Sequence, residues 1–103
     1  MSFNGTEGAP IDLATAAQWT ANYRNNQPNG IRAHFFGRDI LEKILAQDGC
    51  EGIRIYYALN DAGEQQLILV GANANEQDQT NGTIADFSSV CPNNCDPNSV
   101  LNA

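Results

Sequence analysis

The sequence has few of the side chains that most catalytic and metal sites use. Its 103 residues include one histidine, three cysteines and five cations, and 12 acidic residues bring the formal net charge to −7. Nucleic-acid binding normally starts from a basic patch, and here the few cations are dispersed along the chain. We therefore expect no nucleic-acid partner.

Long apolar runs are also missing. No stretch approaches the roughly 20 apolar residues of a membrane span. Residues 1–10, "MSFNGTEGAP", have neither the basic nor the apolar region of a secretory signal. We expect no membrane partner, and by default a cytoplasmic location. An odd, low number of cysteines is not the pattern of a disulfide framework.

The length predicts a single domain over residues 1–103. Within it, residues 1–10 form a polar lead, and residues 90–103 are expected to be an irregular, cysteine-containing tail. Hydrophobic residues make up 42% of the chain. A domain of this length can hold one core without a metal or disulfide as its main support.

Two helices are predicted. Asp12 precedes "LATAAQWTANYRNN" and is a good N-cap, because its carboxylate can accept the free N–H groups of the first turn. "RDILEKILAQDG" gives the clearer helix, with an apolar face ending near Gly49, which is expected just past the helix C-terminus. That face comprises Ile40, Leu41, Ile44 and Leu45.

Strand patterns occupy much of the remaining chain. "IRAHFFG" and "TIADFSS" predict short strands, and "GIRIYYALNDAGEQQLILVGA" predicts a hairpin around the turn residues "NDAG". The unbroken apolar run "LILV" predicts a central strand covered on both faces. The fold class is therefore α+β: a small antiparallel or mixed sheet of three to four strands, with two helices packed on one face.

The tail motif "CPNNC" leaves three hypotheses open for Cys91 and Cys95. A local disulfide is possible, because three intervening residues permit the required approach. A zinc site would need four soft ligands, so it would have to recruit His34 and Cys50 as well. The third hypothesis is idle thiols. Thioredoxin-like chemistry is disfavoured, because it needs a C-x-x-C pair at a helix N-terminus.

No set of residues at catalytic spacing is visible. The single histidine, His34, is read as a packing residue between aromatics, and the carboxylates show no paired spacing. The sequence thus favours a non-catalytic protein. An enzyme with an aromatic pocket around His34, Tyr56 and Tyr57 is the less favoured reading.

Two aromatic pairs point to an interaction surface. Neighbours in a strand face opposite ways, so one member each of Phe35–Phe36 and Tyr56–Tyr57 should face away from the helices. We take Phe36 and Tyr56 as candidate binding residues for a protein partner or a homo-oligomer. The alternative function is a cysteine-based metal or redox site.

The stretches "AHFFGRDILEKIL", "GIRIYYALNDAGEQQLILVGA" and "CPNNC" together resemble a group of small, uncharacterised bacterial proteins with a C-terminal Cys-Pro-x-x-Cys tail. The likeness covers about residues 10–95. It implies a stand-alone domain and carries no activity, cofactor or site residue.

Overall fold

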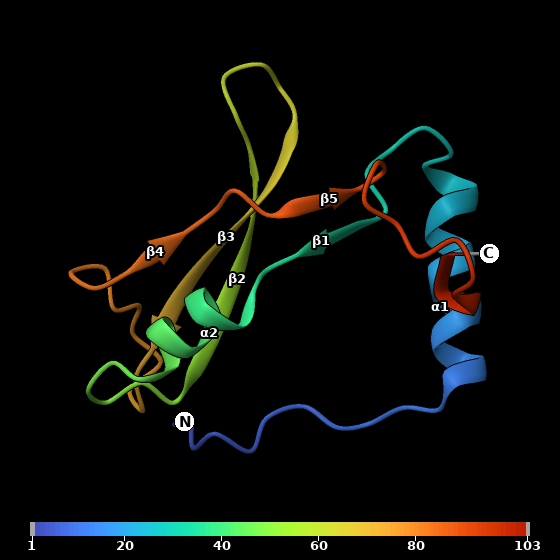
Figure 1. Ribbon diagram of the computed structural model, residues 1–103. Coiled ribbons are helices and arrows are strands. Elements are labelled where there is room, and N and C mark those ends of the chain that lie inside the picture. Colours follow the sequence, from blue (N-terminus) through green and yellow to red (C-terminus); the bar gives the residue numbers. More distant parts are fainter. Residues whose placement is uncertain (1, 103) are drawn as a thin grey trace. The chain divides into compact units, whose positions relative to one another are not determined.

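The computed structural model describes residues 2–102 and is an α+β fold (Figure 1). The elements in chain order are α1 (Leu13–Asn26), β1 (Ala33–Phe35), α2 (Arg38–Leu45), β2 (Gly52–Leu59), β3 (Gln65–Ala72), β4 (Ile84–Ala85), β5 (Ser89–Cys91) and the 3₁₀ helix η1 (Val100–Asn102). The predicted fold class is confirmed.

The chain divides into two compact units, which are described separately. The hairpin unit comprises the residues up to Glu7 together with Phe36–Ser88, and the cystine unit comprises Gly8–Phe35 and the residues from Ser89 onward. The expectation of one domain stays a prediction. The strands form two antiparallel sheets, in the orders β2-β3-β4 and β1-β5, where one sheet was expected.

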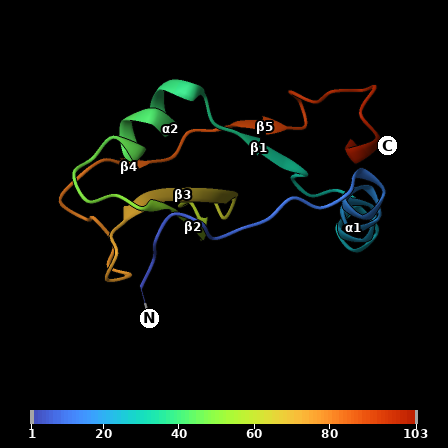
Figure 2. The ribbon, with the colours of Figure 1, turned by 90° about the horizontal axis from the view of Figure 1, so that it is seen from below.

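In the hairpin unit, α2 packs on β2 and β3 (Figures 1 and 2). Ile44 is fully buried, and with Leu69 and Ala85 it forms the centre of the core. Leu69 and Val70 are adjacent in β3 and only 2% and 3% exposed. Because neighbours in a strand face opposite ways, both faces of β3 are covered, as its apolar run predicts.

The predicted end of the second helix is wrong. α2 stops at Leu45 with Ala46 as its C-cap, three residues before Gly49. The N–H of Gln47 donates to the carbonyl of Ile44, and the N–H of Cys50 donates to that of Gln47. Gly49 has φ +76° and serves this turn, which leads into β2.

In the cystine unit, α1 begins as the sequence predicts. The Asp12 carboxylate accepts the Thr15 N–H at 2.7 Å. The helix contacts η1. The expected packing of both helices on one face of a sheet stays a prediction. Arg24 donates to the carbonyl of Leu101 at 2.7 Å, which attaches the two helices to each other.

The prediction of an irregular tail from residue 90 is wrong at both ends of that segment, while residues 92–99 contain no helix or strand. Val90 pairs with His34 and Cys91 with Ala33 in the β1-β5 sheet, and residues 100–102 form η1. The short strand predicted in "TIADFSS" is confirmed as β4, although it contains only Ile84 and Ala85.

Candidate functional site

The β2-β3 hairpin carries a row of exposed apolar side chains. Ile55, Tyr57 and Leu59 alternate along β2 and are 54%, 87% and 73% exposed. Ile53, the first member of the same row, packs instead against the core under α2. The helix therefore covers the start of the row and leaves its last three members to solvent. We call Ile55, Tyr57 and Leu59 the β2 row.

Strand β2 is an edge strand of the β2-β3-β4 sheet. Its eight residues pair with β3, and among residues 2–102 no strand pairs with its other edge. An open edge carries unpaired N–H and C=O groups that can bind another strand. Natural edges are commonly blocked by proline, lysine or short length, and β2 contains neither residue.

Along β2, residues alternately bond to β3 and turn their backbone groups to the open edge. Asn60 N–H donates to the carbonyl of Glu64 at 3.0 Å, so this pair is hydrogen-bonded. Hydrogen-bonded and non-hydrogen-bonded pairs alternate in an antiparallel ladder. The even-numbered residues of β2 therefore bond to β3. The N–H and C=O groups of Ile55, Tyr57 and Leu59 point outward.

The other face of β2 holds a polar cluster. Arg54 Nη1 donates to Asp78 Oδ1 at 2.6 Å and to the carbonyl of Glu76 at 3.2 Å. The Tyr56 hydroxyl donates to Asp78 Oδ2 at 2.5 Å. The Arg54 guanidinium also lies 5.2 Å from the centre of the Phe3 ring, a cation–π contact. Asp78 thus ties the loop after β3 to β2.

The charges of this cluster are mutually satisfied. The Tyr56 hydrogen bond, followed by the bond and charge of Arg54, lowers the pKa of Asp78. The hydrogen bonds that Tyr56 and Arg54 each make to Asp78 raise the pKa of both groups. Each shift moves the pKa of its group further from neutral pH. A general acid or base works best with a pKa near the working pH, so the cluster suits a structural role.

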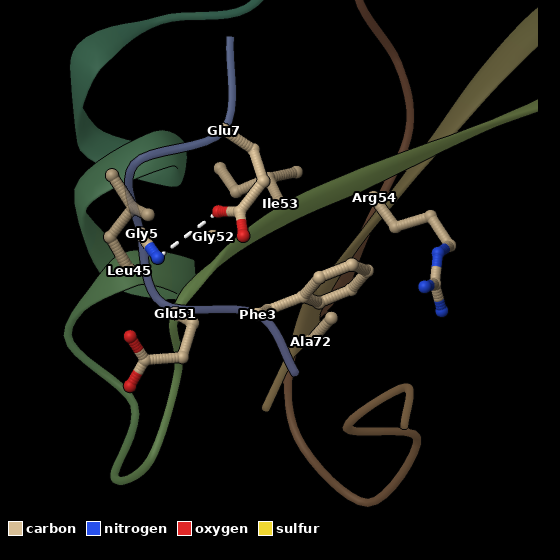
Figure 3. A pocket seen from close by; sticks show the side chains of 9 residues that line it. All are labelled: Phe3, Gly5, Glu7, Leu45, Glu51, Gly52, Ile53, Arg54 and Ala72. Atoms are coloured by element: carbon tan, nitrogen blue, oxygen red, sulfur yellow. Dashed lines mark hydrogen bonds between the residues drawn. The ribbon is translucent and has the colours of Figure 1, made fainter. Parts of the chain in front are cut away.

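A groove of about 480 Å³ lies where the segment before Glu7 passes the start of β2 (Figure 3). Phe3, Leu45 and Ile53 supply apolar lining, and Glu7, Glu51 and Arg54 supply charge. The Glu7 carboxylate accepts the N–H groups of Asn4 and Gly5, each at 3.1 Å.

Backbone N–H groups lower the pKa of Glu7. Its own N–H and that of Asn4 are the main causes that lower its pKa. The Phe3 N–H also donates to the carbonyl of Ala74 at 3.0 Å. The segment is therefore fastened both to itself and to the loop after β3, and it flanks the first residues of β2.

The two predicted binding residues differ in position. Phe36 is half-buried and packs against the core of the hairpin unit, so the prediction that it faces outward is wrong. The chain has left β1 at Phe35, and Phe36 no longer follows strand alternation. Tyr56 is 45% exposed and bonded to Asp78, while its neighbour Tyr57 is the more exposed tyrosine.

Cys91 and Cys95 are joined by a disulfide with their Cα atoms 4.9 Å apart. Cys50 is a free, half-buried thiol whose sulfur lies 3.2 Å from the carbonyl oxygen of Gly52. His34 is half-buried in β1. Within residues 2–102, no group of three or more His, Cys, Asp or Glu side chains is placed to hold a metal ion.

No protein family, curated protein or solved structure matches the chain. The resemblance to small bacterial proteins therefore stays a prediction. In the part of the chain that the structure describes, no helix has the length and apolar character needed to cross a membrane.

Sequence reasoning missed the role of Asp78, because it found no paired spacing among the carboxylates. A usable signal was present: Arg54 and Tyr56 are two residues apart in a predicted strand, so they share a face and can converge on one carboxylate. It also placed the outward aromatic at Tyr56, because it assumed that the helices would cover all of the opposite face.

Proposed function

We propose that the protein is a non-catalytic interaction module that assembles through β2. The observation that carries the proposal is the β2 row beside an unpaired strand edge. Ile55, Tyr57 and Leu59 are each more than half exposed, and their backbone groups point to the same open edge. One strand of a partner could satisfy the backbone groups and cover the side chains together.

The energetics favour association. Fully burying one large apolar side chain contributes roughly 1.5–3 kcal/mol, so covering three of them supplies a useful part of a binding free energy. Exposed edges with apolar side chains are also prone to uncontrolled association unless a partner occupies them. A specific partner on β2 would remove that liability.

The polar cluster supports the non-catalytic part of the proposal. Arg54, Tyr56 and Asp78 satisfy one another, and their pKa values are moved away from neutrality. The alternative, a metal or redox site built from His34, Cys50, Cys91 and Cys95, gains no observation in its favour. Two of its four ligands are bonded to each other.

Light scattering on size-exclusion fractions, from micromolar to millimolar chain concentration, tests the proposal. The wild type is expected to show a mass that rises above the 11.1 kDa of one chain. Tyr57→Thr keeps strand propensity and removes the largest exposed apolar side chain, so it is expected to weaken association strongly.

Phe87→Asn is the matched control. Phe87 is 95% exposed in the same unit but lies outside the strands, and its φ of +61° is one that asparagine tolerates. This variant should associate like the wild type. A wild type that stays at one chain mass at all concentrations, or equal weakening by both substitutions, would contradict assembly through β2.

A further inference from the structure

We infer that the partner of β2 is β2 of a second copy, paired antiparallel about a two-fold axis that passes through Tyr57. The inference rests on the proposed function and names its partner. The three-stranded sheet β2-β3-β4 of each copy would then become half of a continuous six-stranded sheet. A two-fold interface of this kind uses the same surface on both copies, the commonest symmetry of homo-oligomers.

Backbone parity permits this pairing. Odd-numbered residues of β2 turn their N–H and C=O groups outward, as the Asn60–Glu64 bond and the β2-β3 register establish. On the far side of β3, the carbonyl of Gly71 accepts the Gln79 N–H at 2.8 Å, in agreement with the same alternation. A two-fold at Tyr57 pairs odd residues only with odd residues, so the outward groups of Ile55, Tyr57 and Leu59 each meet a partner.

The position of the axis follows from which part of the edge is open. The segment carrying Phe3, Gly5 and Glu7 flanks Gly52 and Ile53, which line the groove with it (Figure 3). With the axis at Tyr57, the central pairs between the two copies involve residues 55–59. These residues lie past the part of β2 that the segment flanks. An axis at Tyr56 would place Leu59 opposite Ile53, in the flanked part.

The side chains of the β2 row are self-complementary in this register. Tyr57 faces Tyr57 of the second copy across the axis, and Ile55 faces Leu59 on each side of it. Aromatic pairs and pairs of apolar residues directly opposite each other are the units that stabilise antiparallel sheets. All three exposed members of the row are used, and each meets an apolar partner.

Charge favours a second copy at this strand although the chain as a whole is acidic. The formal net charge is −7, yet β2 contains no Asp or Glu. Its single charge, Arg54, comes opposite Asn60 of the second copy, next to a turn that contains Asp61 and Glu64. No like charges are placed directly opposite each other along the paired strands.

Two chains with one free thiol each, and with the Cys91–Cys95 disulfide intact, locate the axis. Tyr56 and Ala58 of opposite copies form a non-hydrogen-bonded pair in this register, with Cα atoms about 4.5 Å apart, which a disulfide can bridge. Tyr56→Cys and Ala58→Cys chains, each also carrying Cys50→Ser, are mixed and oxidised. Crosslinks are measured on a non-reducing gel and identified by mass spectrometry.

We expect the mixed Tyr56→Cys/Ala58→Cys dimer, and severalfold less crosslink from either chain alone. Dominant self-crosslinking of Tyr56→Cys would move the axis to Tyr56 and overturn the register. Circular dichroism checks folding, because Tyr56 bonds to Asp78. Tyr57→Cys leaves that bond in place and should crosslink with itself, since its two Cα atoms lie about 5.5 Å apart.

The two proposals fail differently. If Tyr57→Thr abolishes association but no cysteine pair on β2 crosslinks, the interaction module stands, and the β2–β2 pairing is wrong because a different surface or partner meets the row. If the wild type does not associate and nothing crosslinks, both proposals are overturned.

Discussion

The Tyr56 hydroxyl and the Asp78 carboxylate are joined by a 2.5 Å hydrogen bond across 22 residues of sequence. The bond connects the exposed half of β2 to the loop that follows β3. The Arg54 guanidinium donates to the other oxygen of the same carboxylate. This cluster holds the polar face of β2 in place while the opposite face presents the β2 row.

The carboxyl group of Asp78 is expected to titrate below its ordinary pKa of 3.8, because Tyr56 and Arg54 both stabilise the ionised form. Tyr56→Phe should raise that pKa, since the hydroxyl is the largest cause of its lowering. Carboxyl carbon chemical shifts measured by NMR during an acid titration would report both values. An unchanged pKa in Tyr56→Phe would contradict the role given to this bond.

The same shift predicts a pH dependence of stability. A carboxyl whose pKa is lower in the folded protein stabilises it above the unfolded pKa, and loses that effect as pH falls through the folded pKa. The stability difference between wild type and Asp78→Asn should therefore be constant near neutral pH and shrink below the unfolded value of 3.8. Urea unfolding at several pH values measures it. A stability difference between wild type and Asp78→Asn that grows on acidification would contradict this prediction.

Ile44→Ala should destabilise the hairpin unit by about 2–5 kcal/mol, because it removes a fully buried side chain and leaves a cavity beneath the sheet. Leu45→Ala, one position along the same helix, is the control. Leu45 is 49% exposed, so its truncation should cost clearly less. Denaturant unfolding gives both free energies, and equal losses would contradict the assigned helix face.

Thiol titration under denaturing conditions should find one free thiol per chain before reduction and three after it. Cys50 supplies the first, and the Cys91–Cys95 disulfide supplies the other two. Mass spectrometry after alkylation would assign each cysteine. Three free thiols in protein kept under non-reducing conditions would contradict the disulfide.

Local pattern was enough to predict much of the fold. The Asp12 cap, the β2-β3 hairpin and the doubly covered β3 all follow from a few neighbouring residues, and all are confirmed. Each depends on capping chemistry, turn residues or alternation that acts within about ten residues of sequence.

The features that were missed depend on tertiary contacts. Val90 and Cys91 enter a sheet only because β1 offers partners 56 and 58 residues earlier in the chain. Phe36 turns into the core because the strand ends one residue before it. Asp78 is drawn to β2 by the loop that brings it beside Arg54, which no spacing in the sequence specifies.

Amide hydrogen exchange along β2, measured by NMR at low and high protein concentration, tests assembly through this edge most directly. Even-numbered residues such as Tyr56 and Ala58 already bond to β3, so their exchange should change little. The outward amides of Ile55, Tyr57 and Leu59 should exchange fast in dilute protein and become protected as concentration rises. Outward amides that exchange equally fast at every concentration would contradict the account.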